Sequence, residues 1–269
     1  VKQRRFFPKG IAMKKLAIAA SALALTTVAA SAADMAPRYT KAPPPVAAVV
    51  YNWSGCYIGG NLGGGWQRTA QDRVALVDGT VINPANDFGS GTGSAFIGGA
   101  QVGCDYQFAS NWVVGVQGMF DFGNIRETHN NATFAGFTDQ STVKDVFTVT
   151  GRVGYLFTPQ LLGYVKGGGA WAKVDYANFQ PGGALSETAS GINRSGWTVG
   201  GGLEWMFAQG WSVFGEFNYM DFGRKNVSFV AAPGTINVAS VLRSKLEVEQ
   251  FLVGVNYKFN FGGPVVARY

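Results

Sequence analysis

Hydrophobic and polar positions alternate with a period of two through most of the chain after residue 53. From Phe96 to Phe108 the even-numbered residues are apolar or small, whereas the odd-numbered residues are mostly small or polar. Such alternation is typical of a β-strand with one apolar and one polar face. Two weaker segments, 57–66 and 161–171, bring the predicted strands to eight. The six clear segments are 96–108, 112–120, 147–157, 197–207, 211–219 and 251–261.

The connections between these segments alternate in length. Tight links at 109–111, 158–160 and 208–210 alternate with long polar stretches near 67–92, 124–142, 177–194 and 223–241. Every proline after residue 33 falls in a linker, turn, loop or tail, where it removes no donor from a β-ladder. The predicted fold is therefore all-β: an eight-stranded antiparallel transmembrane up-and-down β-barrel with short periplasmic turns and long extracellular loops.

A soluble β-sandwich would show the same alternation, so the aromatic residues decide between the two folds. They stand at both ends of the apolar stripes, as in the belts at membrane interfaces. The predicted periplasmic belt is Trp112, Tyr155, Phe157, Trp205, Trp211, Tyr257 and Phe259; the outer belt is Trp66, Phe96, Phe120, Phe147, Trp171, Trp197, Phe217 and Phe251. These positions favour the barrel.

The N-terminal residues predict a secretory signal peptide. Lys14 and Lys15 precede an apolar run at 16–25, which is too short to span a bilayer, and small residues follow at 30–33. We interpret residues 1–12 as an upstream extension from a misplaced start codon; a basic cytoplasmic arm is the alternative. The predicted organisation is an extension plus signal peptide at 1–33 (the signal proper at 13–33), a Pro-rich periplasmic linker at 34–52, and an outer-membrane β-barrel with a short C-terminal tail at 53–269.

The formal charge of +6 belongs to this leader. Six of the 22 Lys and Arg residues precede residue 34, whereas none of the 16 Asp and Glu residues do, so the remainder is neutral. A basic footprint for nucleic acid is therefore absent, and no nucleic-acid partner is expected. Charged residues make up 14% of the chain, against about 25% in an ordinary soluble domain, which suits a wall that faces lipid.

Four segments of the mature chain resemble a known family. They are WSGCYIGGN at 53–61, VGCDY at 102–106, VGVNYKF at 253–259 and GGPVVA at 262–267. The chain is similar to the small outer-membrane immunogenic, porin-family proteins of alphaproteobacteria, which have an OmpA-like eight-stranded barrel without a peptidoglycan domain. The resemblance implies a place in the Gram-negative outer membrane, in contact with its lipid and lipopolysaccharide, and insertion by the outer-membrane assembly machinery. The chain departs from the usual pattern in one respect. Typical outer-membrane chains end on the aromatic residue of the last strand, whereas eight residues follow Phe261 here.

Six charged residues within the strands have the parity of the face opposite the aromatic residues. Eight strands enclose an interior that side chains just fill, so we expect these groups to form ion pairs in the lumen. They are Asp105, Arg152, Lys166, Glu204, Glu216 and Lys258. The alternative is that they line a thin column of water as separate charges. The first reading predicts a structural, surface-exposed envelope component with a plugged lumen; the second predicts a small porin for ions or very small solutes.

Sequence alone would predict a poorly conducting protein with larger openings after Glu204→Ala or Lys166→Ala. Cys56 and Cys104 both lie towards the periplasmic ends of the first hairpin, so a disulfide is one reading and two small apolar side chains facing lipid is the other.

We expect no enzyme, no cofactor and no metal site. The one histidine of the chain, His129, lies in a polar stretch and is interpreted as a solvated loop residue; Glu127 and Ser141 are near it in sequence, but nothing fixes them as a catalytic group. The glycines at 89–93 lack the spacing of a phosphate-binding loop. Any extracellular ligand would bind the loops, and the sequence does not name one.

Overall fold

The computed structural model describes residues 51–235 and 238–259. The predicted N-terminal extension and signal peptide, all but the last two residues of the predicted linker, and the predicted C-terminal tail after Phe261 lie outside the described residues. Among those that are described, there is no helix long and apolar enough to cross a membrane.

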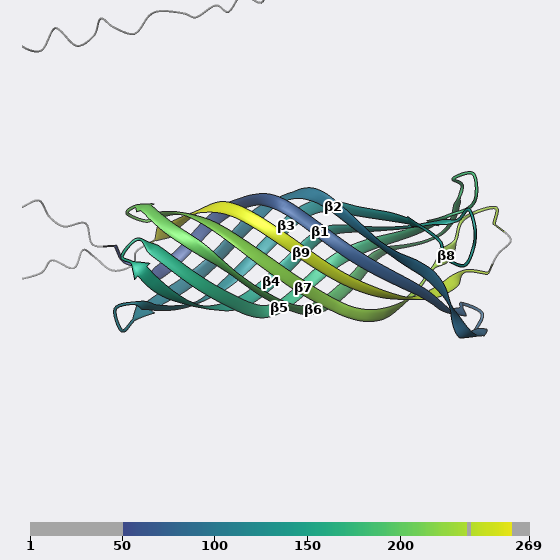
Figure 1. Cartoon of the computed structure of the whole chain (residues 1–269), viewed down its shortest axis with the longest axis horizontal. Coiled ribbons are helices and arrows are strands. Elements are labelled where there is room, and N and C mark those ends of the chain that lie inside the picture. Colours follow the sequence, from purple (N-terminus) through teal and green to yellow (C-terminus); the bar gives the residue numbers. More distant parts are fainter. Residues whose placement is uncertain (1–50, 236–237, 260–269) are drawn as a thin grey trace, which may run out of the picture. The chain divides into compact units, whose positions relative to one another are not determined.

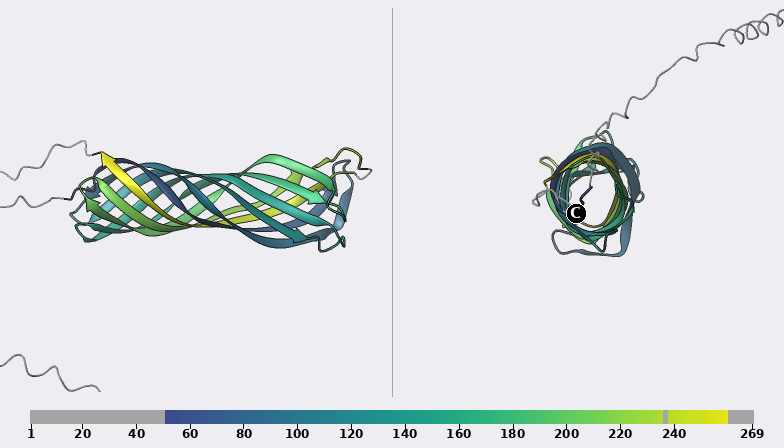
Figure 2. Two further views of the ribbon diagram at one scale, coloured as in Figure 1. Left: turned by 90° about the horizontal axis from the view of Figure 1, so that it is seen from above. Right: turned by 90° about the vertical axis from the view of Figure 1, so that its left-hand side faces the viewer.

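Eight long antiparallel strands close into a ring, as the end-on view shows (Figure 2). Each strand pairs with the next along the chain, and the last strand, β9, pairs with both β7 and β1, which closes the sheet. The strands are β1 Gly55–Leu76, β2 Val81–Phe108, β3 Trp112–Asn130, β4 Thr138–Thr158, β5 Leu161–Phe179, β6 Leu185–Ala208, β7 Trp211–Ser228 and β9 Ser240–Phe259. A two-residue strand, β8 Val230–Ala231, pairs with β6 at the end of the barrel opposite the short turns, which we call the far end (right in Figure 1). The predicted eight-stranded antiparallel barrel is confirmed.

The strands are much longer than the sequence predicted. Most of the stretches expected to be long loops are strand, and the far-end connections shorten to 77–80, 131–137 and 180–184, while 229–239 stays long. Gln67, Thr69 and Gln71 of β1 show the reason, because they point inward and are almost fully buried although they are polar. The outward residues between them, Arg68 and Ala70, carry no large apolar side chain, so this part of the strand has no apolar stripe to reveal its period.

Pro84 was wrongly placed in a loop, since it lies within β2. The β1–β2 register is irregular at this point: Arg73 pairs with Asn86 and Ala75 pairs with Val81, so residues 82–85 have no partner on β1. A proline in this bulge removes no donor from that ladder.

The two faces of the wall are divided as the alternation predicted. All but one of the aromatic residues assigned to the two belts are exposed on the outside, with Phe120 half-buried. The inward positions carry the buried side chains, and these include many polar and charged groups. The interior of the ring therefore contains the polar and charged side chains from which a functional site could form.

Candidate functional site in the barrel lumen

Six strands each turn one of the predicted charges into the lumen. Each of these side chains is at most 7% exposed, and together they comprise three cations and three carboxylates. Asp105 comes from β2, Arg152 from β4, Lys166 from β5, Glu204 from β6, Glu216 from β7 and Lys258 from β9. The ring thus brings together all six residues, which are spread over 154 positions of the sequence.

Arg152 is the centre of this network. Its Nε and Nη2 atoms donate to the two carboxylate oxygens of Asp105 at 2.8 and 2.5 Å, and Nη1 donates to Glu204 Oε2 at 3.0 Å. The guanidinium also lies 4.9 Å from the ring centroid of Tyr57 and 5.0 Å from that of Tyr164. A planar, bidentate donor between two aromatic faces is held in one geometry.

Glu204 and the second ion pair extend the network across the barrel. Glu204 Oε1 accepts hydrogen bonds from Ser212 Oγ at 2.6 Å and Asn256 Nδ2 at 3.0 Å. Lys166 Nζ lies 2.6 Å from Glu216 Oε1. Polar neighbours complete this second pair: Gln117 accepts from Lys166, while Tyr164 and Asn218 donate to Glu216.

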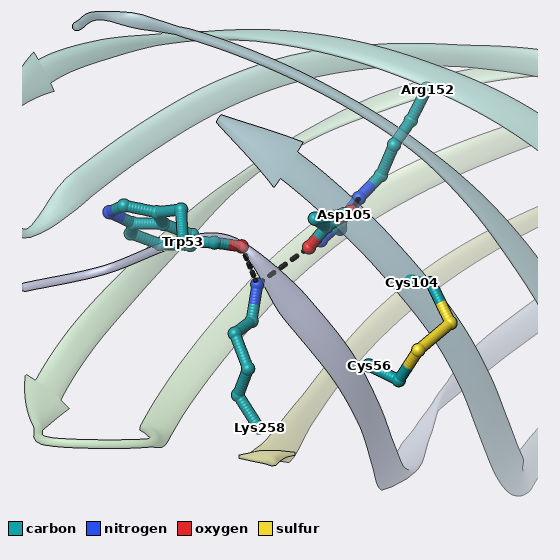
Figure 3. The surroundings of a disulfide bond; sticks show 6 residues. All are labelled: Trp53, Cys56, Cys104, Asp105, Arg152 and Lys258. Atoms are coloured by element: carbon teal, nitrogen blue, oxygen red, sulfur yellow. Dashed lines mark hydrogen bonds and ion pairs between the residues drawn. A yellow bond between two sulfur atoms is a disulfide. The ribbon is translucent and has the colours of Figure 1, made fainter. Parts of the chain in front are cut away.

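Lys258 ties the network to the first described residues of the chain. Its Nζ donates to Asp105 Oδ2 at 2.6 Å and to the backbone oxygen of Trp53 at 2.8 Å (Figure 3). Asp105 therefore accepts from two cations, Arg152 and Lys258. All six charges have a partner of opposite sign.

Cys56 and Cys104 are joined by a disulfide beside this group. The two residues are direct cross-strand partners of β1 and β2, and β1 begins one residue earlier, at Gly55. The bridge therefore links the first hairpin at the end where the short turns lie, and the described residues contain no free cysteine.

An apolar group lies in the lumen at that same end. Trp53 is completely buried within it, and its Nε1 donates to the backbone oxygen of Pro159 in the β4–β5 turn at 3.0 Å. The group, which we name the periplasmic cap, is Trp53, Val113, Leu156, Leu162, Tyr164 and Met206. Sequence reasoning took Trp53 only as the start of the barrel, because nothing in its local pattern shows that it folds inward.

The other half of the lumen contains a larger apolar cluster, which the sequence did not predict. We name it the outer core; its fully buried members include Met119, Ile125, Met220, Leu242, Leu246 and Leu252. The inner face of this half of the barrel is thus mixed and not uniformly polar, since buried polar groups such as Gln67, Asp121 and Arg194 lie among the apolar ones. The parity of a residue shows which way it points, but the neighbours on the other strands decide whether that interior is polar or apolar.

Beyond the outer core, at the far end, a polar cluster surrounds His129. The histidine lies in β3 with its side chain only 9% exposed, its Nδ1 is 2.7 Å from Glu127 Oε1, and its Nε2 is 3.8 Å from Asp139 Oδ2. The expectation of a solvated loop histidine is wrong, because strand β3 continues past Arg126 and turns this side chain inward. Ser141 forms no hydrogen bond with His129. Its Oγ instead accepts a hydrogen bond from Thr69 Oγ1.

The chain matches a known family over most of its length. The sequence pattern described as "Outer membrane protein beta-barrel domain" matches residues 20–259. The protein belongs to this family.

Relatives within the barrel family are outer-membrane proteins of Brucella. The chain is 30% identical over 250 residues to the 31 kDa outer-membrane immunogenic protein of Brucella melitensis biotype 1, covering 91% of this chain and 100% of that protein. It is 28% identical over 253 residues to the 25 kDa outer-membrane immunogenic protein of the same organism, covering 92% and 99%. Among solved structures, the outer-membrane protein OprG of Pseudomonas aeruginosa is 14% identical, with coverage of 79% and 99% and a TM-score of 0.43.

Membership of the outer-membrane barrel family places the protein in the Gram-negative outer membrane. The outward face of the barrel shows where the part that contacts lipid ends. Outward positions change from aromatic to charged just past the outer belt: Arg68 follows Trp66, and Lys173 follows Trp171. Strand β1 nevertheless runs on to Leu76. The strands therefore extend beyond the bilayer on the outer side, and the cluster around His129 lies inside this extramembrane extension.

The position of the lumen charges depends on a glycine on the strand between them. Gly115 of β3 is the cross-strand partner of both Asp105 and Arg152, so the Arg152 side chain passes over it to reach Asp105. A Cβ atom at Gly115 would overlap Asp105 Oδ1 and lie 2.8 Å from the backbone oxygen of Cys104.

We expect Gly115→Ala to lower the free energy of unfolding by about 1–3 kcal/mol, since overpacking must displace Asp105 from Arg152. Urea titration in lipid vesicles, followed by the gel mobility of the unheated protein, measures this change. The matched control is Gly151→Ala, because a Cβ there meets nothing within 4 Å. Equal stability of the two variants would contradict the argument.

Proposed function

We propose that the protein is a structural and surface-exposed component of the outer membrane whose plugged lumen does not conduct. The barrel anchors the chain, and the extramembrane extension with its connections is the part presented to the outside. The observation that carries this proposal is that each of the six predicted lumen charges has an ion-pair partner of opposite sign.

Charge pairing supports a closed lumen because separating these ions would leave single charges in a narrow, poorly hydrated space. The apolar layers on either side of the network add to this barrier. The periplasmic cap lies at one end, and the outer core lies in the half beyond the charges. An ion would have to pass the cap, the network and the apolar side chains of the outer core, among which polar groups such as Asp121 and Gln250 are also buried.

The outward face supports the proposed contact with lipid and lipopolysaccharide. Its apolar band is bounded by aromatic belts, as expected for a barrel wall in a bilayer. Above the outer belt, the exposed cations Arg68, Arg126 and Lys173 are suited to anionic headgroups. We propose that insertion uses the outer-membrane assembly machinery, as the family membership suggests.

We also propose that the protein has no enzymatic activity. His129 is paired with Glu127, and within the described part of the chain it forms no hydrogen bond to a serine or cysteine. No group of three or more His, Cys, Asp or Glu residues among the described positions is arranged to hold a metal ion.

Planar-bilayer recordings test the closed lumen. We expect rare, small openings or none from protein that runs as the folded form on an unheated gel. Because apolar layers lie on both sides of the network, Glu204→Ala and Lys166→Ala are now expected to remain poorly conducting, in contrast to the expectation from sequence. Steady porin-sized currents from the unmodified protein would overturn the proposal in favour of a small porin.

A further inference from the structure

A pocket of about 380 Å³ opens at the extracellular mouth of the barrel, above the outer core. One part of its wall is apolar and includes Phe88 and Phe134, whose rings meet edge to face with centroids 5.9 Å apart. Another part is polar and includes Asp139, Asn178 and Glu187. The pocket thus joins an aromatic wall to an acidic one.

The polar wall has hydrogen-bonding capacity that the protein leaves unused. Asp139 is 1% exposed; its Oδ2 accepts from Asn131, whereas its Oδ1 has no partner among the described residues. Asn178 is 3% exposed; its Nδ2 donates to Glu187 Oε1 at 2.9 Å, whereas its Oδ1 is likewise without a partner there. Both of these atoms are acceptors, and a buried acceptor without a donor is unfavourable; among the pocket's residues the unused donor is Arg73 Nε. A donor-rich ligand would satisfy the two acceptors.

The charges around the pocket also favour a cation. Three carboxylates from three strands gather here, namely Glu127 on β3, Asp139 on β4 and Glu187 on β6, and only Asp139 and Glu187 line the pocket itself. The cations near them are Arg73 of β1 and, when protonated, His129 of β3. Carboxylates therefore outnumber permanent cations at the mouth.

The aromatic wall already receives a cation of the protein's own. The Arg73 guanidinium lies 4.5 Å from the ring centroid of Phe134 and 5.4 Å from that of Phe88. Arg73 forms no ion pair within 4.0 Å among the described residues. Its position demonstrates that these two ring faces accept a positive group, which is the expected preference of an aromatic face.

We propose that this mouth pocket binds a small organic cation: an ammonium group on a short apolar body. The ammonium group donates to Asp139 and Asn178, and the apolar body packs against Phe88 and Phe134. The site lies outside the bilayer, where solutes reach it directly, and it does not depend on whether the lumen conducts.

The protonation of Asp139 gives the binding a characteristic pH dependence. Burial raises the pKa of Asp139 to about 6, although the charge of His129 and the hydrogen bond from Asn131 oppose the rise; Glu187 and Glu127 add to it. Burial by itself would lower the pKa of His129, but its hydrogen bond to Glu127 and the nearby carboxylates raise it instead. As the pH falls below about 6, Asp139 becomes mostly neutral while His129, with its raised pKa, is charged, and a neutral Asp139 beside a charged His129 opposes a bound cation.

Isothermal titration of the full barrel in detergent micelles with phenethylammonium tests the proposal. We expect saturable binding at pH 7.5 that weakens about 10-fold at pH 5, where an alkylammonium stays charged but Asp139 is mostly protonated. Phenylacetate, which has a similar body and the opposite charge, should not bind. A micelle blank removes partitioning of the amine into detergent.

Two variants assign the binding to the pocket. Asp139→Asn should weaken it at least 10-fold at pH 7.5 and remove most of its pH dependence, whereas Asp78→Asn, which deletes an exposed carboxylate of the β1–β2 turn, should leave it unchanged. Phe134→Ala provides an independent loss of affinity if Asp139→Asn fails to fold. Absence of binding, equal binding of phenylacetate, or an unchanged affinity in both pocket variants would overturn the proposal.

Discussion

Replacing Arg152 with methionine is expected to destabilise the barrel by about 3–5 kcal/mol, the effect of removing one partner from a buried ion pair. The methionine keeps much of the length of the side chain, so the loss is chiefly one of charge and donors. Asp105 would retain only Lys258, and Glu204 would retain only the neutral donors Ser212 and Asn256. The measurement is the free energy of unfolding by urea in lipid vesicles, with the folded fraction read from unheated gels.

Two further variants separate charge from packing in this result. Arg126→Met removes an exposed arginine of β3 and should change stability by no more than about 0.5 kcal/mol. Arg152→Met combined with Glu204→Gln should recover part of the loss, since the unpaired carboxylate is removed together with the cation. A double variant that is as unstable as the sum of the two single variants would contradict the importance of this pair.

Trp53→Ala is expected to destabilise the barrel by a similar amount, about 3–5 kcal/mol. The substitution empties the centre of the periplasmic cap, and it also removes the ring that lies 5.1 Å from Lys258 Nζ and the hydrogen bond to Pro159. The same urea titration measures the loss.

Trp53→Phe is the informative partner of this variant. It keeps an aromatic ring in the cap but lacks the indole N–H, so it should lose only about 1 kcal/mol for the hydrogen bond together with a small packing defect. If the alanine and phenylalanine variants were equally stable, the apolar volume of Trp53 would not be what holds the cap together.

The architecture could be predicted from sequence because it follows from local patterns. The period of two in segments such as 96–108 reports an outer and an inner face at every residue, since successive side chains of a strand point to opposite sides. The parity of Arg152 and Glu204 therefore places both side chains in the lumen, although it does not show that they meet there. Alternating tight links and polar stretches then implied neighbouring antiparallel strands.

Where both faces of a strand are polar, the same reasoning failed. Beyond the outer belt, the outward face of β1 carries polar residues such as Arg68, because this face meets water. The inward face of the same segment buries the polar residues Gln67 and Thr69. The pattern has no apolar stripe, so the extension was mistaken for loops and His129 was placed in solvent. Ladder pairing with neighbouring strands, which is not a local property, holds these segments in the barrel.

The sequence by itself thus determined the barrel, its strand number and the inward side of each strand, because these depend on periodicity along one segment. Only the tertiary structure decided which inward groups meet. Arg152 pairs with Asp105 because Gly115 leaves space on the strand between them, and Trp53 folds into the end of the lumen to meet Lys258. These contacts join positions far apart in the chain, and they depend on the stagger of strands around a closed ring, which no single segment specifies.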